Sequence, residues 1–306
     1  MTLTLARSVL AADELETGAP TRAWRPFPTE VADVLCIEEV DDNLEPRIHG
    51  RFSVTLIRSA AVVRCESRRS LVAARNCVLL VPASQLFSLR AQSRSTSGTV
   101  TLLLGAPPQG GPGTTEQAAV VTDTALVEQV EALVTQLSRP VVSIDSTASM
   151  PSLIGRLAAS GAPVGSALPR QGTPLDAARA YLRAHVNELV TIAELADMMG
   201  LAESHLIRAF HREFGLPPHA YQMRLRLASA GELLSRGLSV STVAFECGFA
   251  DQSHLSRNFK AVYGLTPAAW ASAFATGDRR STRPRTRRSM SQAPTRNLRL
   301  ARAIQN

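Results

Sequence analysis

The chain has 306 residues, 45% of them hydrophobic, and a formal net charge of +7. This length gives room for two domains, and because no run of 18 apolar residues occurs, we expect no membrane-spanning helix. The four cysteines have no paired spacing and the N-terminus lacks a long apolar run with a cleavage site, so a cytoplasmic location is expected.

Residues 1–120 contain short β-type runs separated by turns. They fall at 52–57, 61–65, 77–81, 87–90 and 99–104. This pattern predicts a small antiparallel β-barrel or jelly roll. Alternation in the first run puts the apolar Phe52 and Val54 on the face opposite Thr55, and the sequence leaves open which face is inside.

A barrel of this kind offers a cavity at its mouth for a small-molecule effector. The candidates to line that cavity are His49, Phe52, Arg58 and Phe87, and the alternative is that these side chains are simply core. His49 is the only histidine among the first 184 residues, whereas a divalent transition metal needs several convergent imidazole and carboxylate ligands. We therefore expect no metal, no cofactor and no enzyme activity.

Residues 121–160 are predicted to form a helical connector. Asp123 is placed to cap its first helix. The apolar stripe of that helix consists of Leu126, Val130, Leu133, Val134 and Leu137, and Met150, Leu153, Ile154 and Leu157 indicate a second helix. The stripe either pairs with its twin in a homodimer or packs on its own barrel. Residues 161–174, rich in Gly and Pro, are expected to be a flexible linker.

Residues 175–276 contain a repeated phrase. Ser204-His205-Leu206, Arg208, Phe210 and Gly215 recur 49 residues later as Ser253-His254-Leu255, Arg257, Phe259 and Gly264. Each copy follows an apolar residue and Ala, with Gly four residues after that Ala. Before the first copy, Thr191 with Glu194 predicts a capping box, and Gly200 is expected to end the helix in a left-handed conformation. Two short helices joined by a Gly-containing turn predict helix-turn-helix motifs at about 192–213 and 240–263, each placing its second helix in a major groove of DNA.

The second helix of each motif has an outward face that is mostly polar or basic. The candidates for DNA contact are Ser204, Ile207, Arg208, His211 and Arg212 in the first copy and Gln252, Ser253, Ser256, Arg257 and Lys260 in the second. Ile207 can touch only a thymine methyl group. Ala202 and Ala250 lack the side-chain oxygen of a good N-cap, so Glu203 and Asp251 are expected to cap these helices instead.

A third predicted helix connects the two motifs. It starts at Pro217-Pro218 and runs to Gly237. About eighteen residues at 1.5 Å each span roughly 27 Å, which with the sideways offset of the flanking helices separates the two recognition helices by about one DNA turn. One chain is therefore expected to read two successive major grooves.

The positive charge of the chain lies in its tail. Residues 175–276 carry nine Lys and Arg against nine Asp and Glu, whereas residues 277–306 carry nine Arg against one Asp. We expect 277–306 to be a disordered arm, since its composition cannot support a core. The arm either adds salt-sensitive phosphate contacts or is a solvated tail.

The C-terminal sequence resembles the AraC/XylS family of bacterial transcription regulators between Leu175 and about Ala271. The resemblance rests on Val243-Ala244, Cys247-Gly248-Phe249, Asp251-Gln252-Ser253-His254-Leu255, Arg257, Phe259-Lys260, Gly264 and Thr266-Pro267. Residues 49–91, with their order of strand, turn and strand, more weakly resemble the cupin-type sensor barrel that precedes this domain in many members of the family. The resemblance implies an α+β chain with an N-terminal cupin-like barrel, a helical connector and a C-terminal all-α double helix-turn-helix domain.

This resemblance also implies function and partners. It implies an operator in double-stranded DNA, a small effector in the barrel, RNA polymerase if the protein is an activator, and a possible homodimer, with no membrane involved. Two other classes are open: an enzyme built on the barrel, against which the histidine count argues, and an architectural DNA protein driven by the Arg-rich tail.

Overall fold

A computed structural model describes residues 4–6, 21–26, 33–40, 43–66, 69–92, 98–105, 118–138, 141–143, 152–153, 155–157, 159, 162–163 and 173–274. The Arg-rich arm at 277–306 and most of the expected linker at 161–174 lie outside these residues. Among the described helices none is long and apolar enough to cross a membrane.

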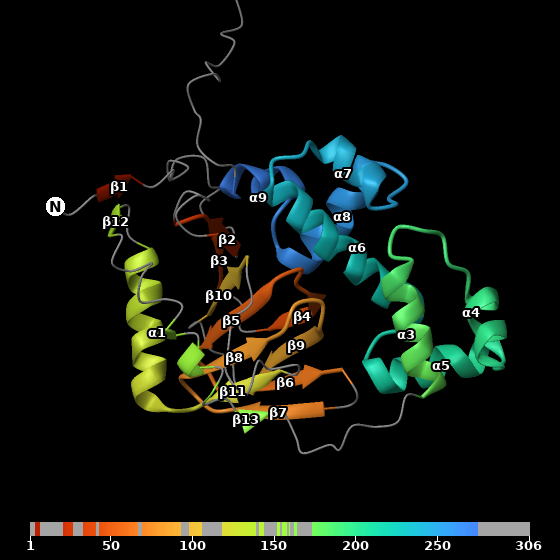
Figure 1. Cartoon of the computed structure of the whole chain (residues 1–306), viewed down its shortest axis with the longest axis horizontal. Coiled ribbons are helices and arrows are strands. Elements are labelled where there is room, and N and C mark those ends of the chain that lie inside the picture. The colour runs from red at the N-terminus through yellow and green to blue at the C-terminus, as the bar shows by residue number, and fades with distance from the viewer. Residues whose placement is uncertain are drawn as a thin grey trace, which may run out of the picture. The chain divides into compact units, whose positions relative to one another are not determined.

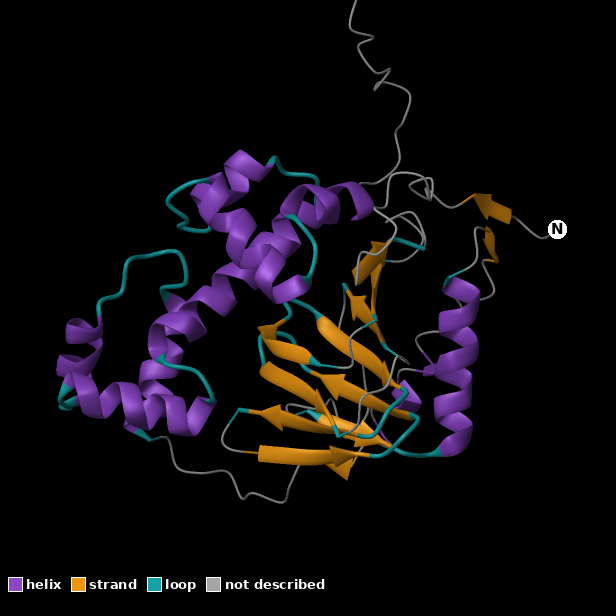
Figure 2. Ribbon diagram, turned by 180° about the vertical axis from the view of Figure 1, so that it is seen from behind, coloured by secondary structure: helices purple, strands orange, loops and turns teal. Residues whose placement is uncertain are grey.

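Thirteen strands are described, and most belong to two antiparallel sheets (Figures 1 and 2). The seven-stranded sheet has the order β13 (Ala162–Pro163), β11 (Ala119–Val121), β8 (Cys77–Val81), β5 (Phe52–Ile57), β10 (Thr99–Leu104), β3 (Val34–Glu39) and β2 (Thr21–Trp24). The four-stranded sheet has the order β4 (Leu44–Ile48), β9 (Leu86–Ala91), β6 (Ala61–Cys65) and β7 (Arg69–Ala73). A separate pair joins β1 (Thr4–Ala6) to β12 (Val141–Ser143).

All five predicted runs are strands, namely β5, β6, β8, β9 and β10. The antiparallel fold is therefore confirmed. The closed barrel is wrong, because the described strands form two sheets with no ladder between them. The jelly roll, which is built from two sheets, is the better of the two predicted descriptions.

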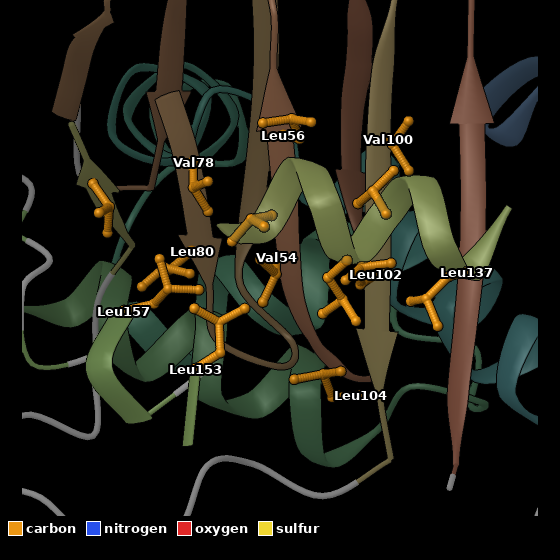
Figure 3. Close-up of a cluster of buried hydrophobic side chains, with 14 of the residues drawn as sticks. Val54, Leu56, Val78, Leu80, Val100, Leu102, Leu104, Leu137, Leu153 and Leu157 are labelled. Carbon is orange, nitrogen blue, oxygen red and sulfur yellow. The ribbon is translucent and has the colours of Figure 1, made fainter. Parts of the chain in front are cut away.

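The predicted connector helix is α1 (Thr124–Leu137), and it covers the outer face of the seven-stranded sheet. Asp123 caps it as predicted, accepting a hydrogen bond of 2.9 Å from the Leu126 amide. Its whole apolar stripe is buried in one cluster with Val54, Leu56 and their neighbours, and Leu153 and Leu157 join this cluster (Figure 3). Of the two alternatives for the stripe, packing on its own sheet is the one observed.

Alternation along β5 decides which side chains face the second sheet. Phe52 and Val54 point toward α1, whereas Ile57 packs in the cluster between the two sheets. Thr55 is fully buried on that inner side, where its Oγ1 atom lies 3.0 Å from Oγ1 of Thr101. The structure therefore answers the question that the sequence left open: the face of β5 that carries Thr55 is the inner one, and the face that carries Phe52 and Val54 is the outer one.

Seven helices form the C-terminal part of the described chain. They are α3 (Pro174–Ala184), α4 (Ile192–Met199), α5 (Glu203–Phe214), α6 (Pro218–Ser235), α7 (Val240–Glu246), α8 (Gln252–Tyr263) and α9 (Pro267–Phe274). α4 with α5 and α7 with α8 are the two predicted helix-turn-helix pairs, and α6 is the predicted connecting helix. We call α3–α5 the first unit and α7–α9 the second unit.

Both units pack against the two sheets within one compact body, to which the described residues up to Phe274 belong. The second unit shares a buried cluster with the seven-stranded sheet, in which Leu35, Ile37 and Leu103 meet Tyr263, Trp270 and Phe274. The first unit shares another with the four-stranded sheet, in which Ile48 and Leu86 meet Phe210 and Phe214, together with Tyr221 of α6. Each recognition helix is therefore anchored through its buried face to the β-rich part of the chain.

A buried carboxylate marks the contact with the first unit. Glu66 is only 4% exposed and accepts hydrogen bonds from Arg179 (2.7 Å), Arg183 (3.1 Å) and the Tyr221 hydroxyl (2.9 Å). The Leu86 amide donates a further bond of 3.0 Å. Four donors around one carboxylate compensate for its removal from water.

Candidate nucleic-acid interface

The first helix-turn-helix forms for the local reasons that the sequence indicated. Thr191 and Glu194 make a reciprocal capping box at the start of α4, with backbone-to-side-chain bonds of 3.0 and 3.2 Å. Gly200 ends α4 in the left-handed region with φ 63°. Leu206 and Phe210 of α5 are fully buried, which turns the opposite face of α5 to solvent.

That exposed face holds every residue predicted for it. Ser204, Ile207, Arg208, His211 and Arg212 are all exposed. The predicted cap at Glu203 is wrong: α5 begins at Glu203 itself, and the preceding Ala202 makes no side-chain cap bond. Glu203 lies in the first turn, where its charge favours the helix dipole without replacing the missing cap bond.

The second helix-turn-helix is better capped. Asp251 accepts a hydrogen bond of 2.7 Å from the His254 amide, as predicted. Leu255 and Phe259 are fully buried beneath α8. On the outer face Gln252, Ser253, Arg257 and Lys260 are exposed and Ser256 is partly exposed. The structure therefore brings each set of predicted DNA contacts together on one helix face.

The cations of 175–276 divide into two groups. Five bond to other groups of the protein, and these are Arg179, Arg183, Arg224, Arg226 and Arg236. The other four, Arg208, Arg212, Arg257 and Lys260, all lie on α5 or α8. Among the described residues, Arg208, Arg257 and Lys260 have no ion-pair partner. Although this region has no net charge, the cations that protein contacts leave unused are concentrated on the two recognition helices.

Sequence reasoning missed that so many arginines serve inside the protein. Arg224 donates to the Pro46 carbonyl (2.6 Å), and Arg226 donates to carbonyls before α4 and after α7. Burial lowers the pKa of both guanidinium groups below its usual value. The signal available in the sequence was their position: both lie on the long helix α6, far from the repeated phrase.

The four residues predicted to line one ligand pocket do not lie together. His49 and Phe87 meet edge to face with ring centroids 5.3 Å apart, but Phe52 faces α1 and Arg58 pairs with Glu131 of α1 at 3.6 Å. The prediction is wrong because alternation along β5 sends Phe52 to the outer face of the sheet. Phe52 and Arg58 are thus part of the α1 contact.

His49 occupies an unusual place at the contact with the second unit. It is 4% exposed, it stacks on Tyr263 at 6.2 Å, and neither ring nitrogen has a hydrogen-bond partner among the described residues. Burial, with a smaller contribution from the charge of Arg47, lowers its pKa to about 3. The described residues contain no group of three or more His, Cys, Asp and Glu side chains that is placed to hold a metal ion.

A cleft lies beside α6. It measures about 600 Å³ and is lined from the β4–β5 and β8–β9 turns and from both helical units, by residues that include Ile48, Ser84, Arg183, Ser229 and Glu246. No residue of the predicted pocket lines this cleft. Sequence analysis could not find this cleft, because the cleft forms only where the helices pack against the β-rich part of the chain.

Comparison with known proteins identifies the helical region. Residues 195–273 match the family described as a helix-turn-helix domain. Over 91 residues the chain is 35% identical to the probable transcriptional regulator LumQ of Photobacterium leiognathi, a match that covers 29% of this chain and 37% of LumQ. Over 89 residues it is 39% identical to the HTH-type transcriptional activator RhaS of Escherichia fergusonii, covering 29% of this chain and 32% of RhaS.

A solved structure described as a probable AraC family transcriptional regulator from Rhodopseudomonas palustris is 28% identical and covers 33% of this chain and 96% of that chain, with a TM-score of 0.31. The chain thus matches about a third of the length of its curated relatives. Residues 195–273, which include most of both helix-turn-helix units, thus match a helix-turn-helix domain, and the relatives that share this region are described as transcriptional regulators.

Proposed function

We propose that the chain is a sequence-specific DNA-binding regulator of transcription and not an enzyme. The observation that carries this proposal is the division of the cations in a region of no net charge. Five bond to other groups of the protein, whereas Arg208, Arg257 and Lys260 on the recognition helices have no ion-pair partner among the described residues. DNA is the polyanion that two such basic helix faces fit.

In this proposal α5 and α8 enter two successive major grooves on one face of the DNA. The 18-residue helix α6 is roughly 27 Å long, and with the sideways offset of the flanking helices this length separates α5 and α8 by about one DNA turn. Arg208 and Arg257 are the first candidates for base contact, because a guanidinium group can bond guanine O6 and N7 together. The polar residues beside them supply further base or phosphate contacts, and Ile207 supplies an apolar contact to a thymine methyl group.

Selection of bound sequences from a random DNA pool, with the full chain, tests this proposal. The expected result is one enriched site with two conserved blocks about ten base pairs apart, centre to centre. A pool that shows no enrichment after repeated rounds contradicts sequence-specific binding. Binding without enrichment instead supports an architectural protein that acts through phosphate contacts.

We further infer that a small effector binds in the cleft beside α6 rather than between the sheets. The cleft of about 600 Å³ has the volume of an ordinary ligand site and is lined by both parts of the chain. Between the sheets, Thr55 and Thr101 are buried and bond to each other. A thermal-shift screen of cytoplasmic metabolites tests the inference. An effector that binds in the cleft should raise the melting temperature of the wild-type protein but not that of Ser229→Trp, whose larger side chain fills the cleft. A ligand that raises the melting temperature of both proteins binds elsewhere.

The remaining partners follow from this role. A regulator of this kind works in the cytoplasm, and RNA polymerase is its further partner if it activates transcription. A homodimer would use surfaces other than the α1 stripe, since that stripe is buried on its own sheet. Size measurement of the full chain with and without operator DNA separates one bound copy from two.

A further inference from the structure

The two helix-turn-helix units share one helix, and this raises the question of what fixes their relative rotation. The first unit packs with Tyr221 and Leu225 in the first half of α6, and the second unit packs with Leu227 and Leu234 in the second half. A straight helix sets the distance between the units along its axis. Their angle around that axis depends on contacts beside the helix.

Arg226, close to the middle of α6, makes such contacts with both units at once. Its Nε and Nη2 atoms donate to the carbonyls of Val186 (2.8 Å) and Glu188 (2.7 Å), in the turn that leads into the first helix-turn-helix. Its Nη1 atom donates to the carbonyl of Gly248 (2.9 Å), in the turn between α7 and α8. Among the described residues no carboxylate pairs with Arg226, so all of its observed bonds go to backbone.

Two neighbours make this junction tight. Gln222, one helical turn earlier, donates 2.9 Å hydrogen bonds to the carbonyls of His185 and Glu188. A Cβ atom added to Gly248 would lie 2.6 Å from the Asn187 carbonyl oxygen and 3.3 Å from Cζ of Arg226. The entry turn of the first helix-turn-helix therefore touches the internal turn of the second, and the guanidinium group of Arg226 bonds to both.

We propose that Arg226 is a positioning residue that sets the angle between the two recognition helices, and so the number of base pairs that one chain accepts between its two DNA blocks. The inference rests on the proposed function. Its physical basis is that the planar guanidinium group holds three carbonyls in fixed directions, which a flexible ammonium group cannot do. Arg226 needs no contact with DNA for this role.

The proposal is testable because the affinity for DNA should depend on the number of base pairs between the two blocks. One inserted base pair moves the second block by about 3.4 Å and rotates it by roughly 34°, so a rigid pair of helices cannot keep both sets of contacts. A pair whose angle is free can follow the shift. The readout is therefore the ratio of affinities for the selected site and for the same site with one base pair added or removed.

The experiment measures fluorescence anisotropy of the selected two-block DNA and its spacing variants with the full chain. We expect wild type to lose about tenfold in affinity on a one-base-pair change. We expect R226A to bind the selected site more weakly and to lose only about twofold on the same change, with R226K between the two. The matched control is R224A, two residues away on α6, whose guanidinium group bonds to Pro46 outside both units; it should keep the wild-type ratio.

The outcomes separate the inference from the proposed function. A wild-type protein with no two-block site contradicts the proposed function itself. A wild-type protein with a clear spacing penalty that R226A retains overturns the inference and assigns the angle to α6 and its contacts with the sheets. Should R226A not fold, as judged by circular dichroism, R226K and Gln222→Leu give the same comparison, and an unchanged ratio in both overturns the inference equally.

Discussion

Arg51, in the turn before β5, and Glu232 of α6 form a bidentate ion pair. The Nε to Oε2 distance is 2.6 Å and the Nη2 to Oε1 distance is 3.0 Å. Arg51 also donates to Asp33 at 2.7 Å, and its side chain is only 7% exposed. The pair joins the β-rich part of the chain to the helix that connects both DNA-binding units.

Glu232→Ala should destabilise the fold by about 2–3 kcal/mol, because it leaves the buried Arg51 with only one carboxylate partner. Urea denaturation followed by circular dichroism measures this. Arg236→Ala is the matched control: it removes the other ion pair of Glu232, but Arg236 is 65% exposed, so its loss should cost less than about 0.5 kcal/mol. Equal losses in the two variants would show that burial of Arg51 does not matter.

Stability should fall in mild acid because of His49. Burial, aided by Arg47, lowers its pKa to about 3, while the unfolded chain has the ordinary value of 6.5. Between pH 6.5 and pH 3, His49 is protonated in the unfolded state but neutral in the folded state. The free energy of unfolding therefore falls as the pH falls through this range, by up to about 1.4 kcal/mol per pH unit.

The comparison variant is His49→Phe, which keeps a ring against Phe87 and removes two ring nitrogens that have no hydrogen-bond partner among the described residues. Its stability at pH 7 should equal or exceed that of wild type. From pH 7 to pH 5 wild type should lose about 2 kcal/mol relative to the variant. Parallel pH profiles would mean that His49 titrates normally.

The C-terminal helices were predictable because their signals are local. Thr191 with Glu194, Gly200 and Asp251 each act within a few residues of the chain, and the structure uses them as predicted. The strands that sequence analysis missed include three at sheet edges, β2, β4 and β7. β4 contains Pro46, which weakens the sequence signal of a strand and is tolerated at an edge.

Long-range packing could not be predicted in the same way. Nothing near Glu66 in the sequence indicates Arg183 or Tyr221, which lie more than a hundred residues later and bond to it. The predicted ligand pocket failed for a related reason, since the inner face of β5 depends on where α1 packs. The exposed faces of α5 and α8 were predictable because helical periodicity alone separates Leu206 from Arg208.

The two turn glycines should tolerate alanine differently. Gly200 and Gly248 both lie in the left-handed region, with φ of 63° and 70°, so each substitution carries a similar backbone strain of about 1 kcal/mol. Only at Gly248 does the added Cβ atom meet other atoms, those of Asn187 and Arg226. Thermal unfolding should show Gly248→Ala about 1–3 kcal/mol less stable than Gly200→Ala. Equal losses would mean that the junction of the two units is loose.

Deleting residues 277–306, which carry nine Arg and one Asp, tests the role of the arm. A specific regulator should keep its preferred sequence and lose affinity, with the slope of log affinity against log salt falling by about 0.9 for each phosphate contact removed. The measurement is a salt titration of binding to selected and random DNA. An unchanged slope identifies a solvated tail, and loss of sequence preference favours the architectural protein.

The central claim is that one chain reads two DNA blocks with two different helices. Repeating the DNA selection with Arg208→Ala and with Arg257→Ala tests it most directly. The account predicts that each variant loses base preference in only one block, and not in the same one, with a cost of about 1–3 kcal/mol for the affected base. If Arg257→Ala erases preference in both blocks and Arg208→Ala in neither, two chains each use α8 and the claim is contradicted.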